Sequence, residues 1–160
     1  MRHAFVFEGT AVLVGPWHEP MDPPERGARI EVRLLEPQPW RGSPFAAQRI
    51  VVDDPIFRAD LFDRMDQPPG ALGSAHFHPS FTGVEPCTRQ WPEAIKADPT
   101  AWLTRELGNL PGLLARAGVD VTGLVWLDTD AAAMRDAAHA IVDAVEAVWA
   151  EVRSEAPALP

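Results

Sequence analysis

The chain has 160 residues, of which 46% are hydrophobic and 23% are charged, as is usual for a single globular domain. Fourteen Lys and Arg residues against 23 Asp and Glu residues give a formal net charge of -9, which disfavours nucleic-acid binding because phosphates are repelled. With a single cysteine, Cys87, no intrachain disulfide can form, and no apolar run approaches the roughly 20 residues of a membrane span, so we expect a cytoplasmic protein with no membrane partner.

The N-terminal half is predicted to form β-strands separated by proline-rich loops. Residues 4–14 are β-prone, with Glu8-Gly9 as a tight turn or bulge. Residues 15–27 contain four prolines and two glycines, and this composition predicts a loop. Residues 28–35 alternate between apolar and charged side chains, which is typical of a strand with one buried face.

A second loop is predicted at 36–44, and Asp53-Asp54-Pro55 supplies a later turn. The remaining predicted strands are residues 46–53, 56–62 and 73–78. A helical turn at 59–65 competes with the second of these. Short strands with closely spaced turn signals favour an antiparallel β-meander of about four to six strands within residues 3–78. Its predicted apolar face holds Ile30, Val32, Leu34, Ile50, Val52, Phe57, Leu61 and Phe77.

The C-terminal part is predicted to be helical, from residue 88 to 154. A short helix is expected at 91–97, Asp98-Pro99 begins a second, and Asn109 can cap a third. Residues 119–127 fit either a strand or the approach to the final helix. That helix is predicted over 130–154, and residues 155–160 are expected to fray. The hydrophobic period changes from two to 3.6 near residue 85, which predicts one α+β domain over 1–160 with helices covering one sheet face.

His76 and His78 form the pattern with the clearest chemistry. Two residues apart on a strand, they point the same way, and this spacing can place two imidazoles on one metal ion. If 56–62 pairs with 73–78, Asp60 projects from the same face. The three side chains would then form a site for one divalent transition metal with open positions for water or substrate. The loop residues His18, Glu19 and Asp22 are alternative sources of the third ligand.

The same polar face also suits chemistry without a metal. A histidine pair with Asp60 can perform acid–base catalysis near neutral pH, while Arg58 and Arg33 can bind a carboxylate or phosphate. His18 and Glu19, in the first predicted loop, are candidates to close over the site. The remaining interpretation is that all of these residues form ordinary ion pairs on a solvated sheet surface.

Two hypotheses for function follow. The first is a small cytoplasmic enzyme that acts on a small polar or anionic molecule, with His76, His78 and Asp60 as its catalytic or metal-binding residues. The sequence contains no GxGxxG, P-loop, HExxH or GxSxG motif, so the standard nucleotide-binding and hydrolase patterns give no support. The second is a non-enzymatic interaction or accessory protein.

A homodimer is also predicted, from the final helix. Its apolar residues recur at steps of three and four, close to the 3.5-residue period of a helix that packs along a partner helix. This seam consists of Met134, Ala138, Ile141, Val145, Val148 and Val152. The alternative is that the seam covers the sheet of its own chain.

Overall fold

Five antiparallel strands form a meander in which each strand pairs with the next along the chain. The computed structural model describes residues 1–154; the tail predicted to fray lies outside them. The strands are β1 (His3–Val6), β2 (Thr10–Glu19), β3 (Glu25–Leu35), β4 (Val52–Arg64) and β5 (His76–His78). The predicted α+β fold with an antiparallel sheet is thereby confirmed.

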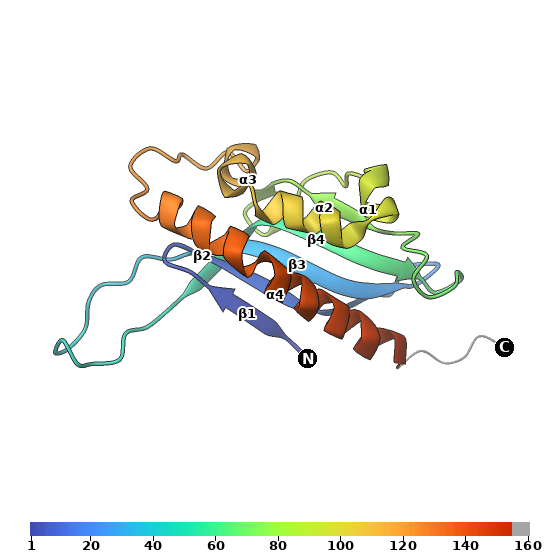
Figure 1. Cartoon of the computed structure of the whole chain (residues 1–160), viewed down its shortest axis with the longest axis horizontal. Coiled ribbons are helices and arrows are strands. Elements are labelled where there is room, and N and C mark those ends of the chain that lie inside the picture. The colour runs from blue at the N-terminus through green and yellow to red at the C-terminus, as the bar shows by residue number, and fades with distance from the viewer. Residues whose placement is uncertain (155–160) are drawn as a thin grey trace.

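The helices cover one face of this sheet (Figure 1). They are α1 (Glu93–Ala97), α2 (Pro99–Leu107), α3 (Leu110–Arg116) and α4 (Leu127–Ser154), and a small two-stranded sheet of β6 (Phe81–Thr82) and β7 (Glu85–Pro86) precedes them. Both predicted caps are confirmed, since the Asp98 carboxylate accepts from the Ala101 amide and the Asn109 side chain accepts from the Gly112 amide. None of the described helices combines the length and apolarity needed to cross a membrane.

The core lies between the sheet and the helices. Ile30, Val32 and Phe57 are fully buried there, and the Phe57 ring stacks with that of Trp102 on α2. One residue of the predicted apolar face is misplaced, because Ile50 is 64% exposed. The opposite face of the sheet carries the charged residues, so the sequence alternation correctly separates core from candidate site.

The apolar seam of α4 is part of this core. All six seam residues are buried within the chain, where α4 packs against β2 and β3. The alternative interpretation of the seam is therefore the correct one, and a dimer cannot form through it without opening the core. The hydrophobic period alone did not distinguish a partner helix from a sheet.

The predicted loop at 15–27 is wrong for most of its length. Strand β2 continues to Glu19 and β3 begins at Glu25, which leaves only residues 20–24 between them. Pro16 is tolerated because β1 pairs with β2 only as far as Val14, so beyond that point β2 is an edge strand that needs no further amide donor. His18 and Glu19 are consequently strand residues and not part of a closing loop.

The connection between β3 and β4 is longer than predicted. Residues 36–51 form an arm that projects from the sheet, seen in teal in Figure 1, and the predicted strand at 46–53 exists only from Val52. Within residues 1–154, no strand pairs with this arm, so the β-prone residues at 46–51 have no partner. The later strands are closer to prediction: β4 contains 56–62 and excludes the competing helical turn, whereas β5 is limited to His76–His78. The predicted turn at 53–55 is wrong, because β4 runs through it and Pro55 lies opposite Arg33, where the register is irregular.

Candidate metal centre

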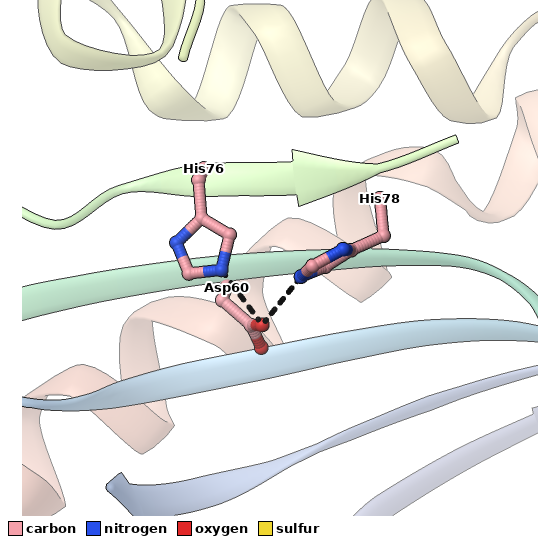
Figure 2. Close-up of side chains that lie close together, drawn as sticks. All are labelled: Asp60, His76 and His78. Carbon is pink, nitrogen blue, oxygen red and sulfur yellow. Dashed lines mark ion pairs between the residues drawn. The ribbon is translucent and has the colours of Figure 1, made fainter. Parts of the chain in front are cut away.

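Asp60, His76 and His78 come together because β4 and β5 pair in antiparallel register. Asp60 lies directly opposite His76, and Arg58 lies opposite His78. Both imidazoles point from β5 toward the Asp60 carboxylate (Figure 2), with Nε2 of His76 at 3.3 Å and Nε2 of His78 at 3.9 Å from Oδ2. One ligand atom from each residue lies within 4.8 Å of the others, a grouping that could hold a metal ion.

Backbone carbonyls fix the orientation of both imidazoles. Nδ1 of His76 lies 2.7 Å from the Ser74 carbonyl oxygen, and Nδ1 of His78 lies 2.6 Å from that of Cys87. A carbonyl oxygen only accepts, so each Nδ1 carries the hydrogen and donates it. In a neutral ring the Nε2 atom then holds the lone pair, and in both rings this atom faces Asp60.

Nε2 of His76 differs from the other three ring nitrogens of the two histidines, which all have partners. It is fully buried and has no hydrogen-bond partner among residues 1–154, because its approach to Asp60 lacks hydrogen-bond geometry. A lone pair directed at a carboxylate is repelled by it. A metal ion shared with Asp60 would remove this repulsion, as would a hydrogen on this nitrogen.

Two arginines neutralise the Asp60 carboxylate. Nε of Arg29 donates to Oδ1 at 2.6 Å and Nη2 donates to Oδ2 at 3.2 Å, while Nε of Arg58 lies 2.9 Å from Oδ2. Burial alone raises the pKa of Asp60, but the contact with His76 and the two guanidinium groups outweigh it and lower the pKa to about 2. Asp60 is therefore ionised at any pH at which the protein is expected to work.

Arg58 also contacts the second histidine. Its Nη2 donates to Nε2 of His78 at 3.0 Å, which places the guanidinium between His78 and Asp60. Burial lowers the pKa of His78, and the positive charge of Arg58 lowers it further, against the opposing effect of the Cys87 carbonyl. His78 is thus held in its neutral form, which is the form that binds metals.

Aromatic rings cover the centre on the side away from the helices. The Trp91 ring lies 4.8 Å from the His76 ring, and Phe62 meets the same imidazole edge-on at 6.2 Å. Phe81 packs near His78 and beneath the Arg58 guanidinium. The three candidate ligands are buried, with Asp60 and His76 at 0% and His78 at 3% exposure.

The other residues singled out in the sequence are placed differently. Glu19 binds Arg29 at 2.8 Å and so touches the centre indirectly, whereas His18 on the neighbouring strand position is exposed. Arg33 lies away from the centre, where it binds Glu31 and the Asp53 carbonyl. Of the predicted anion-binding arginines, only Arg58 reaches the histidines.

Sequence reasoning placed Arg29 on the polar face without naming it as a site residue, and it gave Trp91 no role in the site. Arg29 was predictable in principle, because it shares the polar face and the register Gly15–Arg29–Asp60–His76 follows once strand order is known. Trp91 had no such signal. It reaches His76 because an isolated bridge between Phe77 and Gln90 brings the following chain back beside β5.

Comparisons with known proteins add no further constraint. The sequence matches no family model, and no curated protein or solved structure matches it.

Proposed function

We propose that this protein is a small cytoplasmic enzyme that binds one divalent transition metal through Asp60, His76 and His78. Two imidazoles and one carboxylate leave coordination positions open for water and for a small polar or anionic substrate. The single cysteine, which permits no intrachain disulfide, supports the cytoplasmic assignment.

The observation that carries this proposal is the pair of Nδ1–H donations to backbone carbonyls. Metal-binding histidines characteristically donate the second ring nitrogen to such an acceptor, which fixes the tautomer and aims the free nitrogen. Here both Nε2 atoms converge on the same Asp60 oxygen, and Nε2 of His76 has no hydrogen-bond partner within residues 1–154. Without an ion, Arg58 satisfies Nε2 of His78 while Nε2 of His76 stays unpaired, whereas a shared ion would engage both atoms once Arg58 has moved.

Arg58 opposes ion binding. Its guanidinium occupies the space between Asp60 and His78, and two cations cannot share that space. Ion binding therefore requires Arg58 to turn outward toward solvent, which its position beside the partly exposed Phe81 allows. The proposal accordingly predicts an affinity that is moderate and limited by this displacement.

The direct test is a metal titration of the full chain. We expect Zn²⁺ or Co²⁺ to bind at a one-to-one ratio by calorimetry, and Co²⁺ to show the visible absorption of a site with nitrogen ligands. His78→Gln and the double substitution His76→Ala, His78→Ala should abolish binding. The matched control is His18→Ala with His139→Ala, which removes two exposed imidazoles away from the centre.

Failure of the metal proposal has a clear form. If the wild type binds neither ion while circular dichroism shows it to be folded, or if the control variant loses binding equally, the metal centre is refuted. In the first case His76 holds a proton instead, and the acid–base enzyme without a metal becomes the better proposal.

A second candidate function is supported by the arm at 36–51. Phe45 is 98% exposed and Trp40 is 67% exposed, and exposed aromatic residues of this size commonly anchor interfaces. This favours a non-enzymatic interaction protein, with a second copy of the chain as partner in a homodimer. Light scattering tests it: a dimer that Trp40→Ser with Phe45→Ser converts to a monomer, and that Val125→Ser does not, would support this function.

A further inference from the structure

A hollow of about 430 Å³ opens on the polar face of the sheet, over β1, β2 and β3. It exists partly because Gly15, opposite Arg29 in the register, contributes no side chain to this face. Arg2 lies across this glycine, since a Cβ added to Gly15 would stand 3.1 Å from the Arg2 Cγ atom. The apolar part of the lining comes from Ala4 and Leu13.

Three arginines border this hollow, and they are unequally neutralised. Arg33 binds Glu31 through two nitrogens and is fully engaged. Arg29 uses Nε and Nη2 for Asp60 and Glu19, which leaves Nη1 without a partner among residues 1–154. Within the same described residues, Arg2 makes no ion pair or hydrogen bond. Glu31 is the one carboxylate among the lining residues, so more positive than negative side chains border the hollow, in a protein whose net charge is -9.

An aromatic wall stands beside these cations. The Arg29 guanidinium stacks on the Trp17 ring, with its central carbon 4.0 Å from the ring centroid. Trp17 is nonetheless 39% exposed, so part of its indole remains available to a ligand at the rim. Apolar floor, aromatic wall and unpaired guanidinium nitrogens together suit a ligand with one anionic end and one flat apolar end.

We infer that this hollow binds a small aromatic carboxylate, with its carboxylate at Arg2 and the free Nη1 of Arg29 and its ring against Trp17 and Leu13. An inorganic anion would contact only the arginines and would leave the apolar lining of the hollow exposed to water. Neutral aromatic molecules would leave the arginine donors unpaired.

The hollow is linked to the candidate metal centre through Arg29. The cross-strand row Gly15–Arg29–Asp60–His76 runs from one to the other, and Arg29 contacts both the Trp17 wall and the Asp60 carboxylate. That the bound aromatic carboxylate is the substrate of the enzyme rests on the proposed function. Binding in the hollow itself requires no metal.

The test uses benzoate as the probe and the full chain in the presence of EDTA. Binding is followed through the indole N–H signal of Trp17 in ¹H–¹⁵N spectra, identified with Trp17→Phe, at constant ionic strength. We expect benzoate to shift this signal with a Kd of about 1 mM, as is usual for a ligand of this size, and benzamide to bind at least about tenfold more weakly. Arg2→Gln should weaken benzoate binding about tenfold.

The control is Arg105→Gln, which removes an exposed arginine on α2 with the same change of net charge. Equal weakening by Arg2→Gln and Arg105→Gln would show a general charge effect and overturn the site. Equal affinity for benzamide would overturn the carboxylate, and no shift of the Trp17 signal at about 10 mM benzoate would overturn the whole inference. Because EDTA is present throughout, none of these outcomes depends on the metal proposal.

Discussion

Arg58 occupies the space beside Asp60 and His78 that a bound metal ion would need. The Arg58 guanidinium neutralises Asp60 and donates to His78, so it satisfies the centre electrostatically in the absence of an ion. Its Nε atom nevertheless has no hydrogen bond with good geometry, and burial lowers the pKa of Arg58 against the effect of Asp60. The guanidinium is thus less well accommodated than the short distances suggest.

Removal of Arg58 should therefore favour metal binding. We expect Arg58→Met to raise the affinity for Zn²⁺ at least about tenfold, because the bound ion no longer has to displace a positive charge. Calorimetry on the purified variant measures this directly. Arg64→Met, on the same strand but paired with Asp66 at the surface, is the control and should leave the affinity unchanged. An unchanged or reduced affinity in Arg58→Met would mean that Arg58 supports the ion instead of competing with it.

The lowered pKa values of His78 and Asp60 predict that the stability of the fold declines in acid. The folded state keeps His78 neutral below the unfolded pKa of 6.5, so stability falls as the pH drops below that value. Asp60 adds a second loss as the pH falls from the unfolded pKa of 3.8 toward about 2, worth about 2 kcal/mol in total.

Urea unfolding at several pH values measures both effects without metal present. Between pH 7.5 and 5.5 the wild type should lose more stability than His78→Gln, because the variant cannot take up a proton at this position. Equal changes in the unfolding free energy of the two proteins would contradict the assignment of a neutral, buried His78.

At the scale of elements, the first turn of α4 holds the turn between β1 and β2. The fully buried Asp130 carboxylate accepts from the amides of Glu8 and Gly9 and from the Thr10 hydroxyl, at 2.8 to 3.0 Å. Trp126, one helical turn earlier, packs over Gly9 so closely that a Cβ there would clash. The Asp130 carboxylate therefore connects the first turn of α4 to the hairpin of β1 and β2.

Asp130→Ala should destabilise the fold by about 3 kcal/mol, because it leaves three buried donors without an acceptor. Thermal and urea unfolding measure the loss. Asp128→Ala removes an exposed carboxylate from the same first turn and should change stability by less than about 0.5 kcal/mol. Similar losses in the two variants would show that Asp130 acts through general charge at the helix N-terminus.

Alternation and capping chemistry allowed much of this architecture to be predicted from the sequence. Strand β3 and the Asp98 and Asn109 caps follow from local patterns that tertiary contacts do not override. The limits of β2 and β4 do not follow from local patterns. In β2, a proline is acceptable on the side of the strand that no longer pairs with β1. Before β4, a β-prone segment stays irregular because no strand of residues 1–154 pairs with it.

The candidate site was predictable to the same depth. The triad of Asp60, His76 and His78 followed from strand parity plus one assumed pairing, which the structure bears out. Strand parity also places Arg29 and Arg58 on this face, but their contacts with Asp60 depend on strand order. The position of Trp91 depends on how the chain returns after β5 and has no local signal.

At the scale of the whole molecule, the apolar seam of α4 belongs to the core of its own chain and is not a free surface for a partner. Since Ile141 is fully buried between α4 and the sheet, Ile141→Glu should unfold the chain and not yield a folded monomer. Circular dichroism and light scattering distinguish these results. Glu146→Gln on the exposed side of the helix should leave both readings unchanged. A folded, monomeric Ile141→Glu would restore the seam as an interface.

The arm at 36–51 has its two ends side by side. The Glu36 amide donates to the Val51 carbonyl oxygen at 2.9 Å, directly where β3 leaves the sheet and β4 enters it. The intervening residues could therefore be excised and the strands rejoined by a two-residue Asn-Gly turn. The shortened chain would keep both the Asp60 centre and the arginine-lined hollow, and so would give protein engineers a compact scaffold in which these two sites can be studied without the arm.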